Sequence, residues 1–455
     1  MTTYYRQRRS IFTGLLLILL GVLFLFSELR PEWDLWDFFY RYWPLLLILL
    51  GIAKFFDHFM ATRTGEVRPP AITGGEIALI IVLFFVLGSI VAVHRVKRQL
   101  PDLGIDVDMG DMFEHPYDWT TSLPVESARP NEVVSISTPR GNISVHPSAD
   151  DKLHVIVHKT ASASDESEAR KRADAVNVTV TATSGGYEIR PQESGDQASR
   201  VRVDLEVQLP SQSSITAQAS HGNITVIQMN GPLTVNSRSG DLDIHDITGD
   251  VSLDMSHGDT RLMNVRGNVR LNGAGTELDL TQISGDVTIN GDFFGPIRAR
   301  NVSKSLRYTS SRTNLLLEHL SGQVELDSGD LNVTDLPGSI QLTTSNKDVS
   351  LDNVTGHIEL TGRRGNITVQ FATPPREDVR ITNDSANIEV TLPAQSSFDI
   401  MAVSRSGEIE NDFQGAALKI TTTGDTKVLQ GSYGTRGPHI TLNNTYGTIS
   451  IHKKQ

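Results

Sequence analysis

The stretch Gly240-Asp-Leu-Asp-Ile-His-Asp-Ile-Thr248 is followed at once by Gly249-Asp-Val-Ser-Leu253, and this nine-residue repeat decides the fold. Apolar residues stand at the third and fifth positions of each unit, the period of two that is typical of a short strand with one face turned inward. The Gly-Asp pair indicates a turn, because glycine tolerates positive φ and aspartate caps backbone amides. A fixed period of this kind predicts a solenoid.

Units of this kind fill a large part of the chain. Sixteen of them follow one another from Gly222 onward, and most begin with glycine followed by Asp or Asn. We expect ten of these glycines to form the turns of the solenoid: Gly222, Gly231, Gly240, Gly249, Gly258, Gly267, Gly285, Gly322, Gly338 and Gly356.

The eighth position shows that the true period is two units, or about eighteen residues. It is apolar in alternate units, whereas several units between them carry a small or polar residue such as Ser256 or Ala274. We therefore expect a coil of two strands with two unlike corners, one of them filled by an apolar side chain. About eight coils at ~4.8 Å each would make a two-sheet β-solenoid roughly 40 Å long. The expected core corners are Met229, Ile247, Val265, Ile283, Val302, Leu320, Leu336 and Val354.

The regions on either side of the repeats are expected to close the solenoid. Residues 131–221 predict an N-terminal β cap with one helix, residues 222–365 the repeats, and residues 366–455 a C-terminal β cap. The two caps share a Leu-Pro corner, since Glu206-Val-Gln-Leu-Pro-Ser-Gln-Ser-Ser-Ile215 matches Glu389-Val-Thr-Leu-Pro-Ala-Gln-Ser-Ser-Phe398.

The first 98 residues differ from the rest, because three apolar runs predict transmembrane helices at about 10–28, 40–57 and 76–94. A cleaved signal peptide is the alternative for the first run, but no small-residue cleavage site follows it. Small residues on such helices allow close helix contact, so the candidates are Gly14, Gly21 and Gly51. Flanking basic residues are divided almost evenly, which leaves the membrane orientation open. Residues 99–130 are expected to form a linker.

The composition excludes several classes of protein. The chain has 41 Lys and Arg against 53 Asp and Glu, a net charge of −12, so binding to nucleic acid is not expected. It has no cysteine, which excludes disulfides, thiolate metal sites and a cysteine nucleophile.

The sequence contains no motif that is typical of an enzyme, so we expect no catalytic, cofactor-binding or metal-binding residues. Calcium-binding β-rolls also repeat Gly and Asp every nine residues, but they have more glycines and fewer apolar positions. The aspartates of these units, such as Asp241 and Asp250, therefore predict turns. An acidic cluster is interpreted as a solvated linker, with a hard-cation site as the alternative; its members are Asp102, Asp106, Asp108, Asp111, Glu114 and His115.

Two resemblances cover most of the chain. The duplicated Leu-Leu-Leu-Ile-Leu-Leu-Gly run, at Leu15–Gly21 and again at Leu45–Gly51, resembles the transmembrane region of bacterial LiaI/LiaF-like proteins of the cell-wall-antibiotic response. Residues 131–455, in which a Leu-Pro corner leads into Gly-Asp-Val-x-Leu coils, resemble the bacterial "putative adhesin" β-strand-repeat family. The resemblance implies a bacterial envelope protein and no established chemistry.

Three functions follow as hypotheses. The first is a non-enzymatic β-solenoid, anchored by several helices in the lipid bilayer of the bacterial inner membrane, whose periplasmic or extracellular β domain binds envelope polysaccharide or protein. The second is a regulatory protein of an envelope-stress response that contacts a membrane protein partner through its N-terminal helices. The third is a β-helix enzyme acting on polysaccharide, which needs a carboxylate pair or a basic cluster in a groove.

Overall fold

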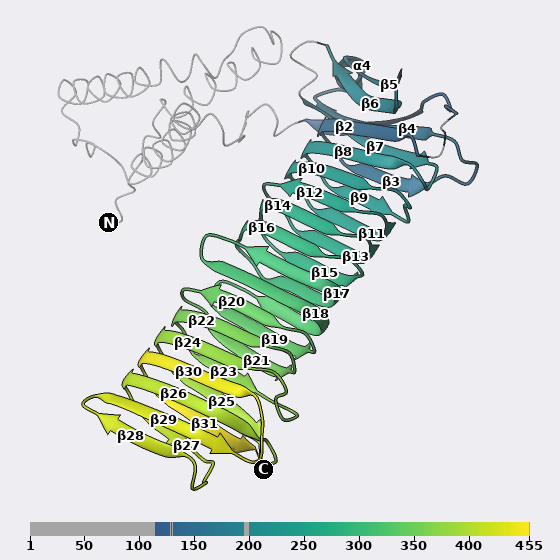
Figure 1. Ribbon diagram of the computed structural model, residues 1–455. Coiled ribbons are helices and arrows are strands. Elements are labelled where there is room, and N and C mark those ends of the chain that lie inside the picture. The colour runs from purple at the N-terminus through teal and green to yellow at the C-terminus, as the bar shows by residue number, and fades with distance from the viewer. Residues whose placement is uncertain (1–113, 128, 130, 195–199, 455) are drawn as a thin grey trace, which may run out of the picture. The chain divides into compact units, whose positions relative to one another are not determined.

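The computed structural model describes residues 114–127, 129, 131–194 and 200–454. These residues form an all-β domain with one helix, α4 (Glu166–Asp174), whose N-cap is Asp165 (Figure 1). In this part of the chain no helix has both the length and the apolar character needed to cross a bilayer. The helices expected at about 10–28, 40–57 and 76–94, with Gly14, Gly21 and Gly51, lie outside the described residues.

The strands are arranged in two series, called here the first sheet and the second sheet, which share β17 and β18. In spatial order, the first sheet contains β1 (His115–Ser122), β4 (His154–Ala163), β7 (Val201–Leu209), β3 (Ile143–Pro147), β9 (Ile224–Ile227), β11 (Leu242–Thr248), β13 (Thr260–Arg266), β15 (Leu278–Ile283), β17 (Ile297–Thr309), β18 (Thr313–Leu326), β19 (Asp330–Leu336), β21 (Asp348–Val354), β23 (Ile367–Gln370), β25 (Ile388–Pro393), β31 (Ile449–Lys454) and β27 (Ile409–Asn411).

The buried side chains of the second sheet belong to the same core as those of the first sheet. In spatial order the second sheet contains β5 (Val176–Thr183), β6 (Gly186–Glu193), β2 (Val133–Arg140), β8 (Ser214–His221), β10 (Leu233–Ser239), β12 (Val251–Met255), β14 (Val269–Gly275), β16 (Val287–Phe293), then β17 and β18, β20 (Ile340–Thr344), β22 (Ile358–Arg364), β24 (Val379–Ser385), β30 (His439–Tyr446), β26 (Phe398–Ser406), β29 (Thr426–Tyr433) and β28 (Lys419–Thr423).

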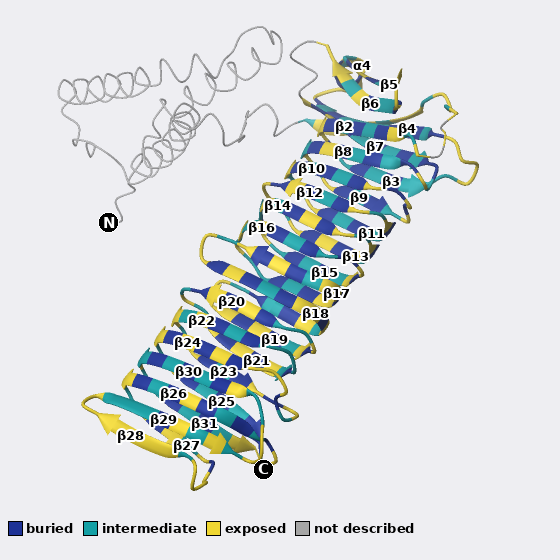
Figure 2. Ribbon diagram, viewed as in Figure 1, coloured by how far each residue is buried: buried dark blue, intermediate teal, exposed yellow. Residues whose placement is uncertain are grey.

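The regular part of the stack has the register that the repeat predicts. Leu233 pairs with Val251 in the second sheet and Leu242 pairs with Thr260 in the first, so parallel partners are eighteen residues apart. Buried and more exposed residues alternate along the strands, as Figure 2 shows. The buried apolar side chains of both sheets form one continuous core.

The apolar corners lie inside this core. All eight corner residues, from Met229 to Val354, are at most 1% exposed. Each follows a non-glycine residue with positive φ, between 52° and 60°. These preceding residues are Gln228, Asp246, Asn264, Gln282, Asn301, His319, Asp335 and Asn353. A left-handed residue therefore turns the chain and points the next side chain inward.

One part of the stack runs against the expected direction. The strand β18 is antiparallel to all three of its neighbours, β17, β19 and β20. Its first half belongs to the second sheet and its last part to the first sheet, so the chain passes through the two sheets in the opposite order to the regular coils. As a result, the unit at Thr313 lies in the second sheet and the unit at Gly322 in the first, opposite to the predicted alternation. Two hairpins cause the reversal, closed by bonds from Ser310 N to Thr313 O (2.9 Å) and from Asp327 N to Asp330 O (3.0 Å).

Both ends of the stack contain an inserted coil. Strands β2 and β3 lie between β6/β7 and β8/β9, and strands β30 and β31 lie between β24/β25 and β26/β27. Each inserted coil lies between two segments that a Leu-Pro corner connects. The corner at Pro210 connects β7 to β8, and the corner at Pro393 connects β25 to β26.

The expected linker over 99–130 is wrong in its last part, because residues His115–Ser122 form strand β1. This strand pairs antiparallel with β4 over its full length. Tyr117 and Trp119 on β1 pack partly buried against the core, and this apolar contact explains why the segment is ordered as a strand.

Candidate functional site

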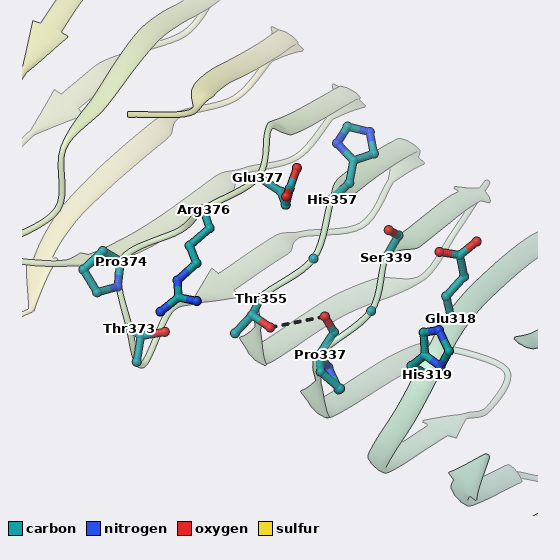
Figure 3. Close-up of a pocket in the computed structure, with 12 residues that line it drawn as sticks. Glu318, His319, Pro337, Ser339, Thr355, His357, Thr373, Pro374, Arg376 and Glu377 are labelled. Atoms are coloured by element: carbon teal, nitrogen blue, oxygen red, sulfur yellow. Dashed lines mark hydrogen bonds between the residues drawn. The ribbon is translucent and has the colours of Figure 1, made fainter. Parts of the chain in front are cut away.

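A polar groove of about 680 Å³ lies along the corners that lead from the first sheet into the second. Figure 3 shows the side chains that line it. They come from four successive segments that pass from one sheet to the other at this edge. These segments contribute Glu318 and His319 from β18, Pro337 to Ser339 after β19, Thr355 to His357 after β21, and Thr373, Pro374, Arg376 and Glu377 after β23.

The groove exists because two irregular segments enclose two regular corners. The regular corners at Gly338 and Gly356 form its floor. On one side, the reversed β18 passes this edge as a continuous strand and carries Glu318 and His319. On the other side, the connection between β23 and β24 is three residues longer than usual, since Ile358 pairs with Val379 at a separation of 21 residues. Its extra residues form the opposite wall.

One of the ten predicted turn glycines is corrected by the structure: Gly322 lies inside strand β18, because the chain passes this edge without turning. Glycine is required at the other nine turns, although the reason differs from the expected one. A positive φ, of 124° to 149°, occurs only at Gly222, Gly240, Gly249 and Gly258 among the ten predicted glycines. The shared reason is close stacking, because a Cβ at any of the ten would lie 2.6 Å or less from backbone atoms of the neighbouring coil. At Gly338, on the groove floor, the distance to the Glu318 carbonyl oxygen would be 1.8 Å.

The walls of the groove carry charged groups that are available to a ligand. Glu318, Arg376 and Glu377 are exposed, and within the described residues none of them forms an ion pair. By contrast, Arg298 elsewhere on the surface is paired with both Glu277 and Glu325. His319 is held in place by a 2.7 Å bond between its Nδ1 and the Ser303 carbonyl oxygen. The groove thus presents acidic, basic and hydroxyl groups together.

The aspartates at the turns have a structural role. The carboxylate of Asp241 accepts a bond from the Asp259 amide (3.0 Å), and Asp250 accepts one from the Asn268 amide (2.8 Å), eighteen residues further on in each case. Bonds from the Ser305 hydroxyl and amide hold the pKa of Asp286 below its usual range. Each side chain thus caps the following coil, and the described residues contain no group of three or more His, Asp or Glu placed to hold a metal ion.

The acidic segment before the β domain reaches the described residues at Glu114. Its carboxylate accepts a 2.8 Å bond from Arg172 of α4, a side chain that also bonds Glu168 at 2.6 Å. Glu114 therefore fixes the start of β1 to the helix. Asp102, Asp106, Asp108 and Asp111 lie outside the described residues.

The groove was not predicted from the sequence, although signals for it were present. The apolar corners are eighteen residues apart except near the reversal, where Ile283 and Val302 are separated by 19 residues and Leu320 and Leu336 by 16. The run Thr373-Pro-Pro-Arg376 also interrupts the Gly-Asp pattern. Breaks in a regular period mark the places where a solenoid presents unusual side chains.

Comparison with known proteins identifies two families along the chain. Residues 131–452 match the family described as Toastrack DUF4097. Residues 11–55 match the family described as the LiaI-LiaF-like transmembrane region. Both resemblances drawn from the sequence are therefore confirmed. A comparison with curated proteins gives no match.

Solved structures with similarity to the chain come from several bacteria. One is a "putative cell adhesion protein" from Clostridium sporogenes, with 12% identity, a TM-score of 0.17, and coverage of 75% of this chain and 100% of that one. Another is a "putative adhesin" from Bacteroides fragilis, with 11% identity, a TM-score of 0.21, and coverage of 74% and 97%. A "putative adhesin" from Parabacteroides distasonis has 10% identity, a TM-score of 0.17, and coverage of 74% and 97%.

Proposed function

The chain belongs to the Toastrack DUF4097 family, and from this membership we infer that it is a non-enzymatic, membrane-anchored β-solenoid of the bacterial cell envelope that binds envelope polymer or protein. The observation that carries the proposal is the presence of a Toastrack region and a LiaI-LiaF-like transmembrane region in one chain. In this proposal three helices, at about 10–28, 40–57 and 76–94, hold the protein in the inner membrane. About eight coils then extend into the periplasm or the exterior.

The groove supports binding rather than catalysis. Its charged groups belong to two walls and are exposed to solvent, whereas a glycosidase needs a carboxylate whose pKa is raised by burial. Within the described residues the carboxylates and the guanidinium of this groove form no ion pair, and the groove also presents hydroxyl groups. Such a groove is suited to a hydrogen-bonding polymer or an exposed peptide loop. We therefore assign envelope recognition to the edge between Glu318 and Glu377.

The location of the β domain is tested by protease access. Intact cells or spheroplasts are treated with protease and compared with lysed cells, and fragments of the β domain are detected with an antibody. Digestion in the unlysed sample is expected. Protection until lysis would place the β domain in the cytoplasm and contradict the proposed envelope display.

The role of the groove is tested with a double substitution, Arg376→Ala with Glu377→Ala, in the full-length protein. We expect retention on purified envelope material to fall at least tenfold while the melting temperature is unchanged, because both side chains are exposed and unpaired among the described residues. Arg266→Ala is the control, since Arg266 is exposed at a regular corner of the same edge. Equal retention of both variants would exclude the groove as the binding site.

A second function is favoured by the match of residues 11–55 alone. In this alternative the N-terminal helices regulate an envelope-stress response by contacting a membrane protein partner. Replacing Gly14, Gly21 and Gly51 by leucine is then expected to abolish capture of the partner while the β domain stays folded. Capture that survives these substitutions would reject the mechanism.

A further inference from the structure

A row of polar side chains runs along the outer face of the second sheet. Its central members are Asn236, Asp254, Asn272 and Asn290, which the register places side by side on β10, β12, β14 and β16. We call these four residues the polar row. The same register continues to Gln218 at one end and, through the reversed β18, to Asn443 at the other. At ~4.8 Å per strand this line is about 50 Å long.

The fold by itself does not account for the asparagines in this line. Asparagine is depleted in strands, whereas threonine at an exposed strand position is favoured by its β-branched side chain. Stacking of amides explains part of the pattern, since Asn272 Nδ2 donates to Asp254 and Asn290 Nδ2 donates to Asn272, both at 3.1 Å. Asn236 forms no side-chain hydrogen bond within the described residues. Each stacked amide also keeps a second N–H group for an external partner.

A hollow of about 400 Å³ lies beside the polar row. It is lined by the neighbouring outward positions of the same four strands, which are Thr234, Ser252, Arg270 and Thr288. Three of these side chains end in hydroxyl groups and the fourth in a guanidinium. The turn residues Asp250 and Asp286 also line the hollow, and their carboxylates accept bonds from the backbone amides of Asn268 and Ser305. The surface next to the row is therefore concave and rich in hydrogen-bonding groups.

The charge on this face differs from that on the first sheet. The first sheet carries a row of alternating charges, Asp243, Arg261, Asp279 and Arg298, in register on its outer face, whereas the polar row contains a single charged residue. On the second sheet the outward positions of the four strands carry Arg238 and Arg270 against Asp254 and Asp292, so the charges of these strands cancel. A face with amides, hydroxyls and no net charge matches a ligand that is uncharged and rich in hydroxyl or acetamido groups.

We propose that the outer face of β10, β12, β14 and β16 binds an uncharged polysaccharide that lies along the strand stack and bonds to the polar row. The repeat of the strands presents hydrogen-bonding side chains at each step, which suits a polymer with a repeating unit. This inference rests on the proposed function and names the class of ligand. It places the contact on a sheet face that is separate from the groove.

The experiment measures binding of the full-length protein, in detergent, to chitin beads, an insoluble polymer of an uncharged acetamido sugar. One triple variant is N236V/N272V/N290V, and its partner is N236T/N272T/N290T. Valine and threonine have the same shape and both favour strands, but only threonine keeps a donor and an acceptor. We expect binding to weaken at least tenfold with valine and less than threefold with threonine.

Two further measurements complete the test. The control T281V/T334V replaces hydroxyl by methyl groups on the outer face of the first sheet, which is the same change that separates the threonine variant from the valine variant. It is expected to bind like the unchanged protein. Binding is also expected to persist in 1 M NaCl, because an uncharged ligand is not screened by salt.

The proposal is overturned if the unchanged protein does not bind chitin, if the valine variant binds as well as the unchanged protein, or if salt abolishes binding. Loss of retention on envelope material through the groove variants, with none through the polar row, would reject this inference and leave the proposed function standing.

Discussion

At the residue scale, each apolar corner depends on a side chain that is fully enclosed by the neighbouring coils. Ile283 is 1% exposed, whereas Ser256, at the other kind of corner, is exposed. We expect Ile283→Asp to destabilise the β domain by about 4 kcal/mol, because it buries an unpaired charge. Ser256→Asp is the control, with an expected change within about 0.5 kcal/mol. Thermal unfolding checks both, and equal effects would show that the assigned corners are wrong.

The residue before each corner contributes through its backbone. Gln282 has φ of 59° and an exposed side chain, so its substitutions test conformation with little change in contacts. Gln282→Gly is expected to leave stability equal or slightly higher, whereas Gln282→Val costs about 1–2 kcal/mol, because a β-branched residue resists the left-handed region. Urea unfolding separates the two variants, and a valine variant as stable as the glycine variant would contradict the role of this turn.

The corner residues could be predicted because spacing alone reveals them, but the left-handed residues could not. They are Asn or Asp at five of these eight positions and Gln or His at the others, so no single residue type marks the position. The turn glycines were predicted from their period, although close stacking of the coils, as at Gly338, is the reason they share. A contact between coils cannot be seen within one unit of the repeat.

At the scale of elements, the reversed β18 depends on the hairpin that joins it to β19. The carboxylate of Asp327 accepts bonds from the amides of Asp330 (2.7 Å) and Gly329 (2.8 Å), and these bonds hold its pKa below the ordinary value of 3.8. A lowered pKa in the folded state means that the ionised group stabilises the protein above about pH 4 and that this contribution is lost as the pH falls through the folded-state pKa.

Asp327→Asn keeps an acceptor and removes the charge. We expect it to lower stability at pH 7 by about 0.5 kcal/mol, because the site is partly exposed and solvent screens it. The difference from the unchanged protein is expected to shrink as the pH falls below about 4. Thermal unfolding at several pH values tests this, and a difference that grows on acidification would reject the assigned role of the carboxylate.

The direction of β18 could not be predicted from the repeat, because inward apolar positions alternate in the same way whichever way a strand runs. Val302 and Leu320 are register partners although their strands are antiparallel. The groove was missed for the same reason, since it is formed where the period breaks. Strand β1 was assigned to the linker because its sequence, His-Pro-Tyr-Asp-Trp, contains a proline and few apolar residues.

At the scale of the whole β domain, each end contains a coil whose position in the stack differs from its position in the chain. These are the inserted coils of β2 and β3 and of β30 and β31. The N-terminal inserted coil contains Gly141-Asn-Ile-Ser-Val-His146, and the C-terminal one contains Gly447-Thr-Ile-Ser-Ile-His452. Each lies next to a corner of sequence Leu-Pro-x-Gln-Ser-Ser. The serines Ser213 and Ser396, at equivalent positions of these corners, are both buried. The two ends are therefore built from the same pair of parts.

Removal of the C-terminal coil tests this construction. Deleting residues 437–455 leaves β24, β25, β26 and β27 with open edges, because β30 and β31 pair with strands on both sides. We expect the truncated protein to aggregate through these edges. A synthetic peptide of residues 437–455, added in trans, is expected to restore a dispersed protein, whereas a scrambled peptide is not. Size-exclusion chromatography measures the outcome. A truncated protein that stays monomeric and keeps the melting temperature of the full chain would show that the inserted coil is dispensable for closing the stack.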